Sequence, residues 1–238
     1  MKNSVEKILG CLYPKKCPVC KDIISEDKWF CDNCLSSLEH SDYDDFCTTC
    51  GFENESCRCR NNEFHFVGAV SVYKNIGNAK TAYYRYKLGR WENMAVFFAK
   101  QCADTVKEVF SDIEFDGLVC VPTANRSFLK RGFDHNKVIS KRISDLLGIK
   151  YYDNLLKCRH FRPMQHNSKF ADRFKNVRGK YYTARSINAK RILLFDDIHT
   201  TGATLDECAK ELLFAGADRV YCVSVLSTAN KNQKGSNK

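Results

Sequence analysis

The sequence predicts an α/β protein with a mostly parallel twisted sheet, helices on both faces and a small N-terminal cysteine-rich module. Apolar strand-like runs alternate with helical patterns through most of the 238 residues, which is typical of a doubly wound sheet. The strongest run, residues 192–195, lacks polar alternation, as expected of a parallel strand covered on both faces. Closely spaced cysteine pairs gather near the N-terminus. We therefore expect a metal-binding module over 11–60, an α/β domain over 64–228 and a disordered tail over 229–238.

The cysteine pairs predict structural zinc. Nine of the 14 cysteines lie in the first 59 residues, and eight of these form four close pairs. Two thiolates of one tight turn can reach the same ion, and two sites of four cysteines each are the simplest assignment. A cross-braced pairing, one zinc with spare thiols, an iron–sulfur cluster and a redox pair are the alternatives. The expected ligands are Cys17, Cys20, Cys31, Cys34, Cys47, Cys50, Cys57 and Cys59.

The net charge of +10 is unevenly divided along the chain. Residues 1–60 hold eight Lys and Arg against eleven Asp and Glu, so the rest of the chain carries +13. A polyanion should therefore meet the α/β domain rather than the cysteine module. No apolar run is long enough to cross a bilayer, and the first residues lack the apolar length of a signal peptide. A cytoplasmic location is the expectation.

Apolar periodicity places the elements of the first half of the α/β domain. The last helix of this half should end at Gly148 and turn Ile139, Ile143, Leu146 and Leu147 inward. The expected elements are strands over 66–73 and 117–121 and helices over 77–88, 92–110 and 135–147.

The second half begins with an expected strand over 151–156. The basic stretch 157–180 follows, and we interpret it as a long mobile loop with at least one helical turn. After the strand at 192–195, a helix with an apolar face ends near Gly216. Thr204 and Glu207 at its start fit a capping box. The last expected strand covers 219–226.

The segment RILLFDDIHTTGATL, residues 191–205, predicts a sugar-phosphate site. Asp196 and Asp197 follow the buried strand, and open α/β sheets bind ligands at the carboxyl ends of their strands. The small residues after them form a turn whose backbone N–H groups and hydroxyls can surround a phosphate at a helix N-terminus. Two carboxylates beside such a turn suit ribose hydroxyls and Mg²⁺. Solvated loop acids and a Thr204 that only caps the helix are the alternative.

This segment resembles the phosphoribosyl-pyrophosphate (PRPP) loop of type I phosphoribosyltransferases. The resemblance implies the type I phosphoribosyltransferase fold, with PRPP and Mg²⁺ as ligands. His199 departs from the pattern, because the family usually has an aliphatic residue there. The residues implied in PRPP binding are Asp196, Asp197, Thr200, Thr201, Gly202, Ala203 and Thr204.

A second segment, residues 120–136, ends a buried strand in a basic loop. Arg126, Lys130 and Arg131 can present cations to a leaving pyrophosphate, on which charge develops during phosphoribosyl transfer. A solvated basic loop is the alternative. The letters KRGFDHN resemble the RRGFNQ signature of the ComF family, with Asp134 and His135 as replacements.

Further blocks resemble the same family in the same order along the chain. They are YYRYKLGR at 83–90, RPMQ at 162–165, RFKNVRG at 173–179 and the CxxC module. The resemblance implies a PRPP-binding protein of DNA uptake and natural transformation, with single-stranded DNA as partner and a DNA-uptake helicase or recombination proteins as further candidates. Asp196, Asp197 and Arg131 are its implied catalytic residues. The residues implied in closing the site or gripping nucleic acid are Lys87, Arg162, Gln165, Arg173 and Asn176.

Other functions remain open at this point. The chain could be a salvage phosphoribosyltransferase acting on a nucleobase or an amine, or a PRPP sensor without turnover. The aromatic residues among the basic segments could stack on bases or belong to the core. They are Tyr83, Tyr84, Tyr86, Phe161, Phe170 and Phe174.

Overall fold

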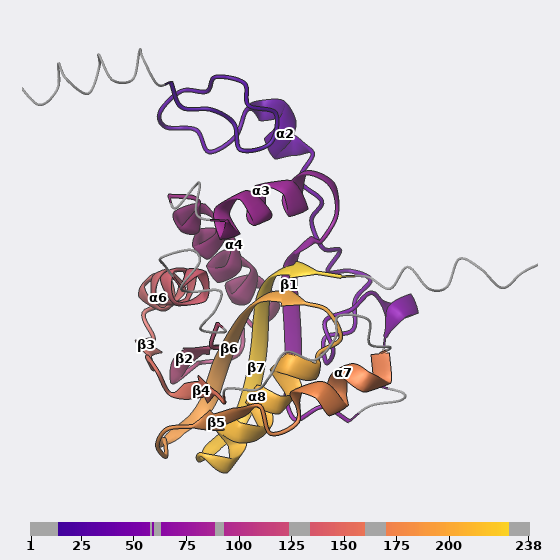
Figure 1. The fold of residues 1–238 in the computed structure, drawn as a ribbon, viewed down its shortest axis with the longest axis vertical. Helices are drawn as coiled ribbons and strands as arrows, with labels where there is room; N and C mark the ends of the chain where they lie inside the picture. Colours follow the sequence, from indigo (N-terminus) through magenta and orange to yellow (C-terminus); the bar gives the residue numbers. More distant parts are fainter. Residues whose placement is uncertain are drawn as a thin grey trace, which may run out of the picture.

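A five-stranded parallel sheet forms the centre of the molecule (Figure 1). The computed structural model describes residues 14–57, 59, 63–88, 93–123, 134–159 and 170–228, and for 170–173 it describes the backbone alone. The predicted fold class is confirmed, because every pair of neighbouring strands in this sheet is parallel. Its strands, in spatial order, are β1 (Gly68–Lys74), β7 (Ala217–Ser227), β6 (Ala189–His199), β2 (Gly117–Cys120) and β3 (Lys150–Tyr151).

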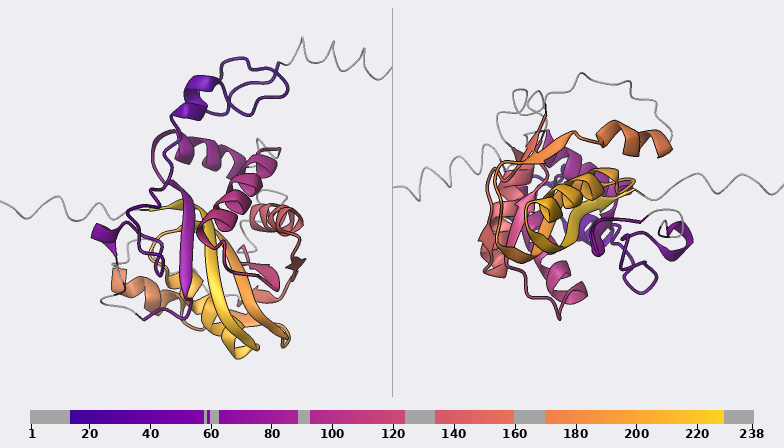
Figure 2. Two further views of the ribbon diagram at one scale, coloured as in Figure 1. Left: turned by 180° about the vertical axis from the view of Figure 1, so that it is seen from behind. Right: turned by 90° about the horizontal axis from the view of Figure 1, so that it is seen from below.

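Helices cover both faces of the sheet (Figures 1 and 2). One face carries α3 (Gly77–Lys87), α4 (Met94–Val109) and α6 (His135–Leu147), and the other carries α8 (Ala203–Phe214). Along β6, Ile192 and Leu194 join the core under α8, whereas Leu193 and Phe195 join the core on the opposite face. The run reads as continuously apolar because both faces are buried.

The region after β3 differs from the expected single strand over 151–156. A turn at Asp153 and Asn154, the latter with a φ of +55°, separates β3 from β4 (Leu156–Cys158). The strand β4 pairs antiparallel with β5 (Tyr181–Thr183), which the sequence did not predict. Between them, α7 (Phe170–Val177) packs beside α8 and confirms a helix in the basic stretch.

Three smaller predictions in this domain are wrong. Leu146 is 46% exposed rather than inward. The strand β6 continues through the two acids to His199, because it keeps its pairing with β7 beyond Phe195. No capping box starts α8: its N-cap is Gly202, and the Glu207 carboxylate instead accepts the backbone N–H of Gly179 at 2.5 Å.

The cysteine module lies against the sheet and its helices (Figure 1). Its only helices in the described residues are α2 (Asp32–Ser36) and the 3-10 turn η1 (Asn54–Ser56). Residues 39–41 run beside edge strand β1, where the Ser41 N–H donates to the Val72 carbonyl at 2.9 Å. The Glu39 carboxylate accepts the Asn78 and Ala79 N–H groups of α3 at 3.1 and 2.9 Å. The module therefore protects an otherwise open sheet edge and caps a helix.

The boundaries 11–60 and 64–228 stay predictions, and the tail 229–238 lies outside the described residues. Across the described part of the chain, no helix combines the length and apolar character needed to cross a bilayer.

Candidate functional site

The strand order places a candidate ligand site between the carboxyl ends of β2 and β6. These strands are neighbours, but the chain leaves β2 for β3 on one side and leaves β6 for β7 on the other. Such a switch in connection direction opens a crevice above the sheet, and ligands of α/β proteins bind there. Asp196 and Asp197 lie near this end of β6, where Ile198 and His199 complete the strand.

Asp197 is held by two cationic or polar side chains from two helices. Lys87, the last residue of α3, donates from Nζ to Oδ2 of Asp197. His135, the first residue of α6, lies with Nε2 at 3.0 Å from the same oxygen and is 2% exposed. Burial alone would raise the pKa of Asp197, but His135 and Lys87 outweigh it and hold this pKa below its ordinary value.

Asp196 has different surroundings from its neighbour. Its Oδ1 accepts the backbone N–H of Asp197 at 2.9 Å and lies 3.4 Å from Nδ2 of Asn136. Burial raises the pKa of Asp196 well above its ordinary value, and the charge of Asp197 raises it further. The pKa values of the two adjacent carboxyl groups are thus shifted in opposite directions, a division that suits Asp197 to cations and Asp196 to hydroxyls.

The first turn of α6 is positioned by local capping. The Asp134 carboxylate accepts the backbone N–H groups of Asn136 and Lys137 at 3.1 and 3.3 Å. The hydroxyl of Thr123, just after β2, donates to the same carboxylate at 2.8 Å. Because His135 lies immediately after this cap, the cap also fixes the imidazole that contacts Asp197.

Residues 200–203, which we call the phosphate turn after the ligand predicted for it, run from the end of β6 into the first residue of α8. Gly202 has a φ of +82°, and a Cβ on it would lie 3.0 Å from the Phe64 ring, so glycine fits this position on two counts. The Thr201 hydroxyl accepts the Ala203 N–H at 3.3 Å. The turn leads into the N-terminus of α8, where backbone N–H groups and the helix dipole favour an anion.

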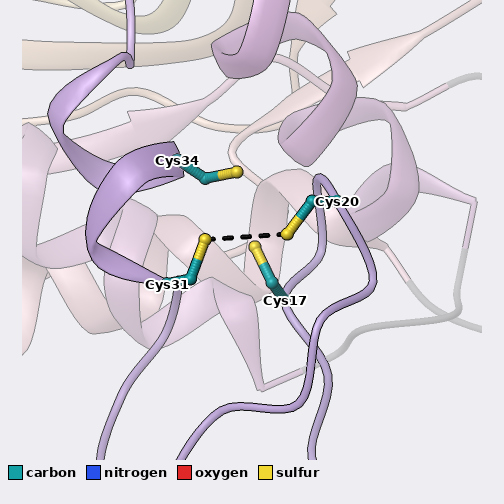
Figure 3. Close-up of side chains that lie close together, drawn as sticks. All are labelled: Cys17, Cys20, Cys31 and Cys34. Carbon is teal, nitrogen blue, oxygen red and sulfur yellow. Dashed lines mark hydrogen bonds between the residues drawn. The ribbon is translucent and has the colours of Figure 1, made fainter.

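Two four-cysteine clusters form separate candidate metal centres. The first, ribbon 1, joins Cys17, Cys20, Cys31 and Cys34 (Figure 3), and the second, ribbon 2, joins Cys47, Cys50, Cys57 and Cys59. Within each cluster the sulfur atoms lie within 4.8 Å of one another, and Cys20 and Cys31 are 3.6 Å apart. Four thiolates around Zn²⁺ at about 2.3 Å would stand roughly 3.8 Å apart, so the clusters fit tetrahedral zinc. The clusters follow the sequential pairing, not the cross-braced alternative.

The cysteine module and longer parts of the chain resemble known proteins. Residues 8–62 match the double zinc ribbon domain. Competence protein F of Haemophilus influenzae is 28% identical over 108 residues, covering 44% of this chain and 47% of that protein. DNA utilization protein YhgH of Escherichia coli is 26% identical over 110 residues, covering 45% and 48%. The chain thus spans about half the length of these two curated relatives.

One match extends over most of the chain. Competence protein ComFC of Streptococcus pneumoniae is 26% identical over 207 residues, which cover 85% of this chain and 89% of that protein. The chain is ComF-like. Its zinc is structural, because all four ligands of each cluster come from the protein and the double zinc ribbon match covers both clusters.

Solved structures similar to the ComF-like chain include two phosphoribosyltransferases. The adenine phosphoribosyltransferase of Saccharomyces cerevisiae has a TM-score of 0.34 and 14% identity, and the match covers 54% of this chain and 68% of that one. The purine phosphoribosyltransferase of Pyrococcus horikoshii has a TM-score of 0.35 and 16% identity, with 58% and 83% covered.

The other predicted site residues of the ComF-like chain divide into four groups. Lys87, whose role the sequence left open, contacts Asp197. Asn176 is half-buried on α7, and the contacts described there do not connect it to the acids. For Arg173 only the backbone is described. The remaining candidates lie outside the described residues: Arg126, Lys130, Arg131, Arg162 and Gln165.

Sequence reasoning did not identify His135 and Asn136 as site residues. Both lie in the segment KRGFDHN, where His135 was noted only as a departure from the family signature. The available signal was their position at the start of a helix that follows a buried strand, since that position faces the carboxyl end of the sheet. Their contacts with the two acids depend on the placement of α6 next to β6.

Proposed function

We propose that the ComF-like chain binds PRPP with Mg²⁺ at the end of β6 and acts in DNA uptake with single-stranded DNA as its partner. The observation that carries the proposal is the pair Asp196 and Asp197 beside a glycine turn that enters a helix N-terminus. A ribose 5-phosphate needs hydroxyl acceptors next to an anion site, and this arrangement offers both within one connection.

The donor set also fits Mg²⁺. An ionised carboxylate is a preferred ligand of this cation, and Asp197 is held in its ionised form by Lys87 and His135. Asp197 would hold Mg²⁺ together with the pyrophosphate of PRPP, and the cation would neutralise charge on that leaving group. Lys87 would supply a further positive charge at the same place, and Asp196 would orient the ribose hydroxyls.

Charge and one exposed aromatic residue support the DNA partner. The residues after 60 carry +13, which favours contact with a phosphate backbone. Tyr83 and Tyr86 are fully buried, so base stacking by them is ruled out as a role. Tyr84 is 37% exposed on α3, and the Nζ atoms of Lys80 and Lys87 each lie 6.0 Å from its ring centre. A base could stack there while Lys80 contacts a phosphate.

The decisive experiment measures PRPP binding calorimetrically with Mg²⁺ on the intact chain and on the double variant Asp196→Asn/Asp197→Asn. We expect a loss of affinity of at least about a hundredfold, because both charge and acceptor capacity change, while two zinc ions per chain remain. Asp104→Asn is the matched control, since Asp104 pairs with Lys100 on the surface of α4. Unchanged affinity in the double variant would refute the site.

Further measurements on the same proteins distinguish the alternative functions. PRPP consumption with a panel of nucleobases and amines would reveal a salvage transferase, whereas tight binding without turnover would indicate a sensor. Single-stranded DNA binding should weaken steeply with salt and should weaken in Tyr84→Ala. Salt-independent binding, or none, would remove DNA from the proposal and leave PRPP binding to stand alone.

A further inference from the structure

Ribbon 2 lies directly beside the phosphate turn. Phe52, five residues before Cys57, is 3% exposed, and its ring centre lies 4.3 Å from that of His199. His199 is 1% exposed and is the last residue of β6, immediately before Thr200. A side chain from the loop between the cysteines of ribbon 2 therefore packs on the residue that precedes the phosphate turn.

The segment that leaves ribbon 2 contacts the other end of the turn. Phe64 is the residue whose ring lies 3.0 Å from an ideal Cβ on Gly202. The backbone N–H of His65 donates to the Asp206 carboxylate at 2.6 Å, in the first turn of α8. Phe52 therefore contacts the residue before the turn through an aromatic pair, and His65 contacts the helix after the turn through a hydrogen bond.

Ribbon 2 itself is fixed to the sheet by close backbone contacts. The Ala69 N–H on β1 donates to the Thr48 carbonyl at 3.0 Å. Gly51 has a φ of +70°, and a Cβ there would lie 2.8 Å from the Ala69 carbonyl oxygen. The backbone of Gly51 lies so close to β1 that no side chain would fit between them. Ribbon 2 therefore has one tightly defined position against this strand.

Ribbon 1 reaches different parts of the molecule. Its Phe30 is 1% exposed and packs edge-on against Phe97 of α4, with 5.0 Å between the ring centres. The Arg85 guanidinium of α3 donates to the carbonyls of Pro18 and Val19 between the first two cysteines. These contacts stabilise the helical layer and do not include the phosphate turn.

We propose that ribbon 2 and the segment 63–65 form one wall of the PRPP site, with Phe52 and Phe64 as positioning residues for the phosphate turn. This inference rests on the proposed PRPP binding. The zinc of ribbon 2 fixes the loop that carries Phe52, and Phe52 fixes His199 and the backbone N–H groups after it. A misplacement of about 1 Å in such groups can cost up to about a hundredfold in rate, so the wall acts on the site through the position of the phosphate turn.

The test compares equal truncations in the two ribbons. Phe52→Ala and Phe30→Ala each remove one buried phenyl ring from a zinc ribbon, and Mg²⁺-dependent PRPP affinity, zinc content and thermal midpoint are measured for both. We expect Phe52→Ala to weaken PRPP binding at least about tenfold and Phe30→Ala to weaken it less than about threefold. Phe52→Leu, which keeps an apolar contact with His199, should restore most of the affinity.

Two further variants keep the proposal testable if Phe52→Ala does not fold. Phe64→Ala alters a half-buried residue outside the ribbon and should weaken PRPP binding while two zinc ions stay bound. His199→Ala removes the contact with Phe52 from the side of β6 and should likewise weaken PRPP binding at least about tenfold while two zinc ions stay bound.

The outcomes separate this inference from the proposed function. Absence of PRPP binding to the unaltered chain would refute the proposed function itself. PRPP binding to the unaltered chain, with equal loss in Phe30→Ala and Phe52→Ala, would overturn only the inference and indicate general destabilisation. Wild-type affinity in Phe52→Ala, or in Phe64→Ala should the former not fold, would overturn it as well.

Discussion

Asp196 and Asp197 are adjacent in sequence but have opposite electrostatic surroundings. Burial and the neighbouring charge raise the pKa of Asp196, whereas His135 and Lys87 hold the pKa of Asp197 low. The division depends on three elements, since Lys87 ends α3, His135 begins α6 and both acids lie on β6. A single local motif therefore supplies the acids, and distant parts of the chain determine their protonation.

His135 gives the first prediction at the scale of single residues. His135→Ala should lower PRPP affinity about tenfold or more, because a hydrogen bond to a charged group contributes about 1.5–3 kcal/mol. His135→Gln keeps a donor near Asp197 and should lose less than about threefold. Isothermal titration with Mg²⁺ measures the PRPP affinity of both variants. Equal losses of affinity would contradict a role for the hydrogen bond between His135 and Asp197.

The sequence predicts the two acids, the glycine turn and all eight cysteine ligands because each set is local. Spacing within a few residues determines which side chains can share an ion or a phosphate. The contact of His135 with Asp197 joins residues 62 positions apart, and its geometry follows from helix packing. No local pattern predicts such a contact, so the sequence indicates only the segment in which His135 lies.

At the scale of elements, the start of α6 determines the geometry of the site. Its N-cap, Asp134, bonds two backbone N–H groups of α6 and the Thr123 hydroxyl. Losing this cap would loosen the turn that carries both His135 and Asn136. Stability and ligand affinity are therefore linked at this helix end.

The second prediction concerns this cap. Asp134→Ala should lower the free energy of unfolding by about 1 kcal/mol, with a range of roughly 0.5–2, and should also weaken PRPP binding. The control is Asp145→Ala near the C-terminus of the same helix, where an exposed acid opposes the helix dipole and its removal should not destabilise. Urea unfolding compares the two variants; equal destabilisation would contradict the capping role.

Elements with strong periodicity were predicted well, and short ones were not. The helix over 135–147 has the predicted bounds, because its apolar repeat and the left-handed Gly148 mark them. The predicted strand over 151–156 is two short strands in different sheets, β3 and β4. Runs of two or three residues show too little alternation of polar and apolar side chains to predict which sheet they join. The positive φ of Asn154 also interrupts the strand predicted over 151–156.

At the scale of the whole molecule, the cysteine module is part of the folded body. Cys17, Phe30 and Leu38 belong to the same apolar core as the helices α3, α4 and α6. Glu39 caps α3, and Thr48 bonds β1. The module therefore contributes packing, a helix cap and a covered sheet edge to the α/β domain.

Zinc removal supplies the third prediction. A strong chelator should lower the melting temperature of the entire chain by more than about 10 °C in a single transition, because several kcal/mol of metal-dependent packing are lost. Differential scanning calorimetry measures this, and added zinc should restore the original midpoint. Two transitions, with the larger one unchanged by the chelator, would show instead that the module folds independently.

The pairing of β1 with β7 has a consequence for synthesis on the ribosome. The zinc ribbons are local in sequence and can acquire their metal as soon as they emerge, whereas β7 is translated after every other strand of the sheet. Until then β1 has no neighbouring strand in the sheet, and residues 39–41 and 48 of the cysteine module are already available to bond its backbone. The module can thus cover the open edge of β1 in the nascent chain, during the interval in which this strand is most prone to cause aggregation.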